Sequence, residues 1–148
     1  LPQPLPMRIL AVDHGEIHIG LALSDPAGIV ARPLLAYTHV SRRHDAAFVA
    51  NTAKQEGVAA IVVGTPTDAA GDLGKAARRV RRFTAALKQC TTLPVQYWDE
   101  SDSTTRATQI SSHQSRRRNH SIHSIAAAVI LQDYLDAHAS QNDSPPES

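Results

Sequence analysis

Short runs of aliphatic residues, separated by glycine, proline and aspartate, mark the first part of the chain. They predict strands at residues 8–12, 18–24 and about 29–35. Gly15 and residues 25–28 supply the turns between them. Two short turns that join three strands predict an antiparallel meander.

The next segment has the spacing of a helix. Ser41 can cap a helix that runs to about Glu56, and Gly57 is placed to end it. Its apolar side is expected to come from Ala47, Phe48 and Ala50.

Strands and helices then alternate. Residues 59–64 are continuously aliphatic, which is typical of a strand covered on both faces, and residues 93–98 form the last strand. Helices are predicted at about 72–89, 103–110 and 120–139. The inner stripe of the first of these is Ala76, Val80, Phe83 and Leu87. The order predicts an α/β fold in which a mixed five-stranded sheet, an antiparallel meander followed by parallel strands, is flanked by helices.

Composition narrows the class of protein. The 148 residues suffice for one domain with its own core, expected at 7–139, between an N-terminal arm (1–6) and a polar tail (140–148). Cys90 is the single cysteine, which excludes an internal disulfide and favours a cytoplasmic location. No stretch has the length of a membrane span, so no membrane partner is expected.

The net charge of +1 hides an uneven distribution, with acids at strand ends and arginines in two groups. Asp13 ends the first aliphatic run, where a carboxylate has no packing role; a turn-forming aspartate is the alternative. Asp99 and Glu100 end the last strand. Parallel strands end at one edge of a sheet, so Asp13 and Glu100 can converge there and hold a divalent cation, unless both are solvated loop acids.

With these segments the chain resembles the YqgF/RuvX family, bacterial proteins with a ribonuclease-H-like fold described as Holliday-junction resolvases and as nucleases that mature small-subunit ribosomal RNA. The resemblance rests on ordered segments at family spacing that span almost everything from Met7 to Asp136. They are residues 8–15, 19–26, 29–34, 62–66 with Gly71, Asp99-Glu100 with Thr104 and Ala107, and 125–135.

The resemblance implies a metal-dependent endonuclease that cleaves structured nucleic acid, with Asp13 and Glu100 holding the ions of a two-metal mechanism. The substrates it implies are branched DNA and precursor ribosomal RNA. Junction cleavage requires two symmetric cuts and hence a homodimer, whereas no apolar stripe identifies an interface, so monomer and homodimer both stay open. The rival hypothesis is a catalytically degraded relative that binds nucleic acid or ribosome-maturation partners without cutting.

The third acidic position of the family departs from its pattern. Members usually have an aspartate where this chain has His123, just before an alanine-rich helix. His120 lies three residues earlier on the same helical face and is a further candidate ligand, as is Asp102, which can instead cap a helix. Imidazole ligands favour softer ions, so we expect Mn²⁺ to be preferred over Mg²⁺. A solvated or capping histidine is the alternative for His123.

Basic residues supply the candidate contacts with phosphate. Family members tend to be basic at the positions of Ile17 and His18, and His18 is kept as a candidate. Arg116, Arg117 and Arg118 can contact several phosphates, or form only a charged connector. A second group is expected to be a solvated helix face: Arg78, Arg79, Arg81 and Arg82.

Overall fold

The computed structural model describes residues 8–66, 73–99 and 122–142. The predicted helix at 103–110, the predicted arm and most of the predicted tail lie outside these ranges. The elements, in chain order, are β1 (Ile9–His14), β2 (His18–Ser24), β3 (Ala31–Thr38), α1 (Arg42–Glu56), β4 (Ala60–Thr65), α2 (Leu73–Cys90), β5 (Val95–Asp99) and α4 (Ile122–Asn142).

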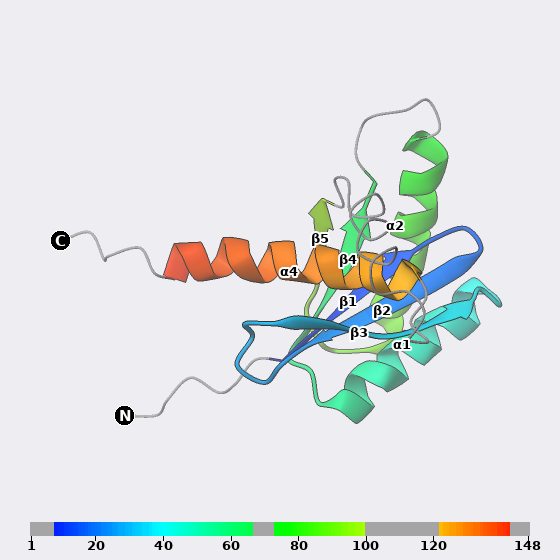
Figure 1. The fold of residues 1–148 in the computed structure, drawn as a ribbon. Helices are drawn as coiled ribbons and strands as arrows, with labels where there is room; N and C mark the ends of the chain where they lie inside the picture. The colour runs from blue at the N-terminus through cyan, green and yellow to red at the C-terminus, as the bar shows by residue number, and fades with distance from the viewer. Residues whose placement is uncertain (1–7, 67–72, 100–121, 143–148) are drawn as a thin grey trace.

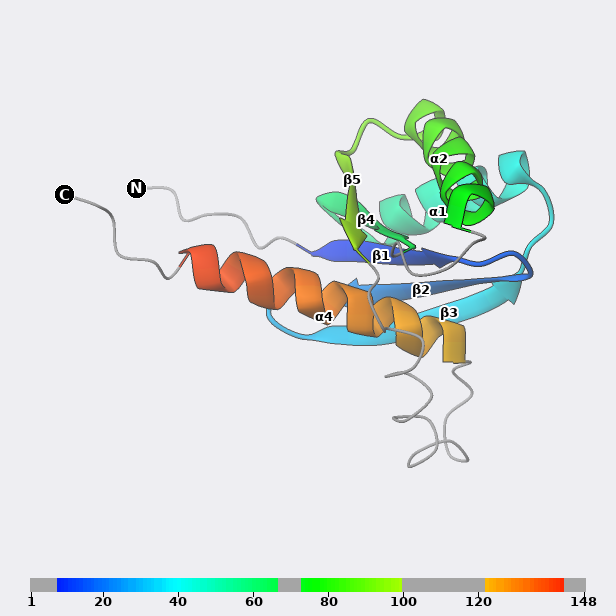
Figure 2. The same cartoon turned by 90° about the horizontal axis from the view of Figure 1, so that it is seen from above.

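The five strands form one sheet in the order β3-β2-β1-β4-β5. β1 and β2, and likewise β2 and β3, pair antiparallel, whereas β4 pairs parallel with both β1 and β5. The predicted meander and the predicted parallel portion are therefore confirmed. Figures 1 and 2 show α1 and α2 on one face of this sheet and α4, of the helices in the described ranges, across the other.

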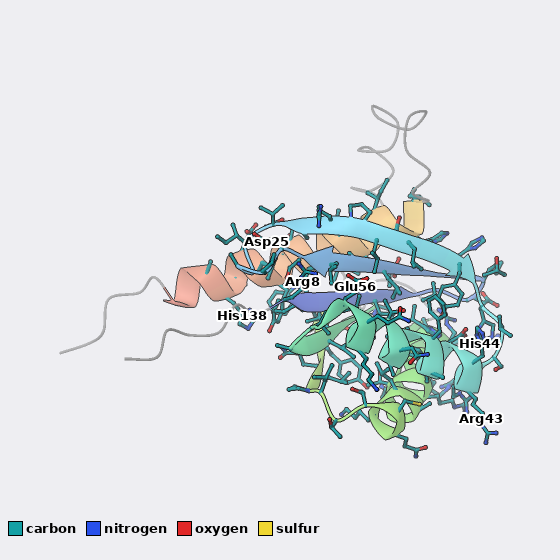
Figure 3. All side chains as sticks on the ribbon, turned by 90° about the horizontal axis from the view of Figure 1, so that it is seen from below. Arg8, Asp25, Arg43, His44, Glu56 and His138 are labelled. Atoms are coloured by element: carbon teal, nitrogen blue, oxygen red, sulfur yellow. The ribbon has the colours of Figure 1, made fainter. Side chains whose placement is uncertain are left out.

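Helix α1 begins and ends where the sequence predicts. The Ser41 hydroxyl accepts a hydrogen bond from the His44 N–H at 3.1 Å, and Gly57 closes the helix with φ 65°. An ion pair of 3.8 Å between Arg8 and Glu56 joins the last turn to the start of β1 (Figure 3). Both side chains are partly exposed, so we attribute at most about 1 kcal/mol to this pair.

The predicted apolar side of α1 is wrong in detail. Ala47 is exposed, and Phe48 and Ala50 are only partly buried. The sheet instead contacts Ala46, Val49 and Ala53, which are fully buried. The spacing of these three residues follows the helical repeat, and a shift of one residue turns the face by about 100°. The correct stripe includes the polar Asp45 and Thr52, which concealed it in the sequence.

Alternation along β1 divides the core into two parts. Leu10 and Val12 pack against α1 and α2, where the predicted stripe of α2 is buried at Val80, Phe83 and Leu87 and half-buried at Ala76. Ile9 and Ala11 face the opposite way and pack against α4. The α4 residues of this second cluster are Ala127, Ile130, Leu131, Tyr134 and Leu135.

Helix α4 is fixed over the meander by one amide side chain and one glycine. The Gln132 side chain accepts from the Ala31 N–H and donates to the Ile29 carbonyl, both at 2.9 Å. Gly20 lets the helix backbone touch the sheet, because a Cβ there would lie 2.0 Å from the carbonyl oxygen of His123. No helix in the described part of the chain is long and apolar enough to cross a membrane.

Candidate active site

Asp13 lies inside β1, one residue before its end, and not in the turn that follows. Its side chain is buried, with 6% of its surface exposed. Because alternate residues of a strand share a face, Asp13 faces α4, as Ile9 and Ala11 do. Strand pairing places it opposite Gly20 of β2.

His123 reaches the same place from the first turn of α4. Its backbone rests on Gly20, the strand partner of Asp13, and its ring lies 4.7 Å from the ring of His18, measured between centroids. Opposite residues in an antiparallel pair are about 5 Å apart. Three predicted site residues, Asp13, His18 and His123, therefore gather at one end of the sheet, on the face covered by α4.

The surroundings of His123 lower its pKa. Burial lowers the pKa of His123 below its usual value, and the neighbouring His18 lowers it further. A neutral imidazole has a free lone pair on one ring nitrogen, the form in which histidine binds a metal ion. The environment of His123 therefore suits a side chain that acts as a metal ligand.

The remaining predicted ligands lie outside the described residues. These are Glu100, Asp102 and His120, and the same applies to Arg116, Arg117 and Arg118. Within residues 8–66, 73–99 and 122–142 no group of three histidine, cysteine, aspartate or glutamate side chains is arranged to hold a metal ion. β5 does end at Asp99, directly before Glu100, and it runs parallel to β1 through β4. The ends of β1 and β5 therefore lie at the same edge, two strand spacings or about 10 Å apart.

Gly20 was not predicted as a site residue from the sequence. Glycine within a strand weakens it and often marks a place where another backbone approaches closely. Gly20 lies between buried aliphatic neighbours of β2, so this signal was present in the sequence. Its partner in the approach, the start of α4, is more than 100 residues away and could not be read locally.

His14, next to Asp13, points to the opposite face of the sheet, where its ring lies 4.4 Å from that of Phe83. Burial lowers its pKa to about 4, assisted by the positive charge of Arg79. His14 is therefore neutral at pH 7, on the side of the sheet away from the acid.

This depressed pKa predicts acid sensitivity. The unfolded chain takes up a proton at His14 near pH 6.5, whereas the folded chain does so only near pH 4. Stability is therefore present above pH 6.5 and lost as the pH falls toward 4, by about 2 kcal/mol between pH 7 and pH 5. Urea unfolding at both pH values measures the loss, and His14→Leu should reduce it. An equal loss in the variant would contradict this assignment.

Similarity to known proteins identifies the class of protein to which the chain belongs. The chain is similar to the solved structure of RuvC from T. thermophilus in complex with a Holliday junction substrate, with a TM-score of 0.60 and 15% identity over 90% of this chain and 96% of that one. It is also similar to the fowlpox virus resolvase in complex with a Holliday junction, with a TM-score of 0.52 and 11% identity over 89% of this chain and 99% of that one. The chain thus has the ribonuclease-H-like fold. Residues 7–137 match the family described as "RuvX: Holliday junction resolvase". The chain belongs to this family and is a nuclease.

Curated relatives match along nearly the whole chain. A protein of Symbiobacterium thermophilum is 42% identical over 145 residues, which are 96% of this chain and 99% of that protein. One from Syntrophus aciditrophicus is 37% identical over 134 residues, 88% and 89% of the two chains. Both carry the name "Putative pre-16S rRNA nuclease".

Proposed function

We propose that the protein is a metal-dependent endonuclease that hydrolyses phosphodiester bonds in structured nucleic acid, with Asp13, Glu100 and His123 as its metal ligands. The observation that carries this proposal is the position of Asp13. A buried carboxylate at a strand end, near an imidazole, is a donor pair that suits a divalent cation.

The residues have separable roles in this proposal. In this proposal Asp13 and Glu100 would hold the cations at the sheet edge where β1 and β5 end. The separation of about 10 Å between these strands leaves room for ions and a phosphate. A divalent cation held by these residues would supply an activated water as nucleophile and charge stabilisation for the leaving oxygen. The neutral His123 adds a ligand without adding charge, so the site holds one negative charge fewer than a site of three acids.

The substrate is proposed from the relatives. Their names point to precursor 16S ribosomal RNA, and the family description points to four-way DNA junctions. Both are structured polyanions, and the proposed ligands act on a phosphodiester whichever sugar carries it. The predicted cytoplasmic location, and the choice between monomer and homodimer, stay predictions.

Cleavage assays on both substrates test the proposal. Purified protein is incubated with a labelled four-way junction or a precursor ribosomal RNA fragment, with Mn²⁺, Mg²⁺ or a chelator. We expect metal-dependent cuts that the chelator abolishes, and none from the Asp13→Asn variant. Binding without cutting under every metal condition would instead support the rival hypothesis of a degraded relative.

Metal preference tests the role of His123. We expect the wild type to be several-fold more active with Mn²⁺ than with Mg²⁺, because imidazole favours the softer ion. His123→Ala should lower activity with Mn²⁺ and remove the preference.

A matched control for this variant is His138→Ala. His138 lies on the same helix, well along α4 from its start, and Figure 3 labels it there. It contacts Tyr134 and Trp98, is not a proposed ligand, and lies about 22 Å along the helix axis from His123. Equal wild-type activity with both metals, or an His123→Ala enzyme that behaves like His138→Ala, would contradict the role of His123.

A further inference from the structure

A cavity of about 480 Å³ lies on the face of the sheet opposite α4, between the start of α1, the end of β1 and α2. His14 and Phe83 line it and are almost fully buried. The rest of its lining is dominated by cationic side chains, namely Arg42, Lys75, Arg78, Arg79 and Arg82.

The cationic residues are arranged by the helix repeat. Lys75 and Arg79 are four residues apart, as are Arg78 and Arg82, so the two pairs lie side by side on one face of α2. The predicted solvated face is thus wrong for Arg79, which is partly buried, and incomplete for Arg78 and Arg82, which are exposed but line the cavity. Of these four arginines, only Arg81 is both exposed and absent from the lining of the cavity.

No carboxylate of the described residues lines this cavity. The nearest acid in the sequence of α1, Asp45, is fully buried and already bonded to His39. Five like charges around one hollow repel each other and create a strongly positive potential, which a bound anion relieves.

Two buried nitrogen atoms of the lining also lack partners. Nδ1 of His14 and Nε of Arg79 are both inaccessible to solvent and form no hydrogen bond with any described residue. A buried polar group without a partner costs about 1–3 kcal/mol. A ligand that carries several acceptor oxygens would balance these charges, and it would reach the two nitrogens once the side chains that cover them move aside; phosphate is the common biological group of that kind.

We propose that this cavity binds a phosphate group of the nucleic-acid substrate, on the side of the sheet away from the carboxylates. The inference rests on the proposed function for the identity of the ligand. Asp13 and His14 are consecutive residues that face opposite sides of the same strand end, so a polynucleotide that passes around this end reaches both faces. Arg78 and Arg82, which are exposed as Arg42 and Lys75 are, can then contact the backbone of the polynucleotide.

Binding measured without metal separates this site from catalysis. The dissociation constant of a labelled four-way DNA junction is determined in chelator at 50 to 200 mM salt. We expect the double variant Arg78→Gln with Arg82→Gln to bind about tenfold or more weakly, and its salt slope to fall by about two, because each phosphate contact contributes about 0.9 to the slope. Arg81→Gln is the control, since it removes one arginine charge from the same helix outside the cavity, and it should change the slope little.

The outcomes distinguish the possible sources of phosphate. An unchanged junction affinity in the double variant would overturn the assignment to nucleic acid. Inorganic pyrophosphate that binds the wild type but not the double variant, measured by calorimetry, would then assign the cavity to a free phosphate compound. If pyrophosphate also fails to bind, the phosphate site itself is overturned. If the wild type binds the junction through these arginines but cleaves neither substrate, the phosphate-binding inference stands, and only the proposed nuclease activity is contradicted.

Discussion

Replacing Asp13 with asparagine is expected to lower the rate of cleavage by at least about 100-fold while the protein stays folded. Asparagine has nearly the same shape but no charge, so it cannot balance a divalent cation at this position. Loss of a few kcal/mol of charge stabilisation corresponds to a rate loss of this size. The measurement is single-turnover cleavage of a four-way junction and of precursor ribosomal RNA, with a thermal melt to show that the variant is folded.

The matched control is the same chemical change at Asp25. This partly exposed carboxylate accepts hydrogen bonds from the N–H groups of Val30 and Ile29 in the turn after β2, which hold its pKa below the usual value. Figure 3 shows Asp25 at the end of the sheet away from His44 and the start of α1. Asp25→Asn should cleave at the wild-type rate. Full activity in Asp13→Asn would mean that another site, or a contaminating nuclease, cuts the substrate.

Replacing Gly20 with alanine is expected to displace the start of α4 and to destabilise the protein by about 3 kcal/mol, a fall in Tm of about 10 °C. The added Cβ would lie 2.0 Å from the carbonyl oxygen and 2.2 Å from the carbonyl carbon of His123. Both are backbone atoms, so no side chain can rotate away to make room. Cleavage should fall as well, because the same shift moves His123 away from Asp13.

Gly74→Ala is the control for this variant. Gly74 is exposed near the start of α2, and the nearest atom to an added Cβ is in the Arg78 guanidinium at 3.5 Å, an ordinary contact. Alanine is favoured over glycine in a helix by up to about 1 kcal/mol, so this variant should be as stable as the wild type or slightly more stable. A Gly20→Ala protein with wild-type Tm and activity would show that α4 does not need its close approach.

Local signals carried most of the prediction of the fold. Ser41 and Gly57 bound a helix by capping chemistry, and aliphatic runs separated by turn residues located the strands. The buried side of α1 was misplaced because it contains Asp45, whose burial depends on His39 from the preceding loop. Such a pairing is tertiary and leaves no periodic trace in the sequence.

The site was predictable only in part, for a similar reason. Asp13 stood out because a carboxylate ended an aliphatic run, and the family resemblance added His123. The approach of α4 to Gly20, and the arginines that gather with His14, depend on packing between segments far apart in the chain. The same arginines in isolation have the spacing of an ordinary solvated helix face.

The central claim is that Asp13 and Glu100 share a divalent cation with His123, and crystals soaked in Mn²⁺ test it most directly. Anomalous scattering locates manganese independently of any assumption about its ligands. The account predicts a peak within bonding distance, about 2.0–2.3 Å, of a carboxylate oxygen of Asp13, of one of Glu100 and of a ring nitrogen of His123. Manganese bound elsewhere, with the carboxylates of Asp13 and Glu100 pointing apart, would contradict it.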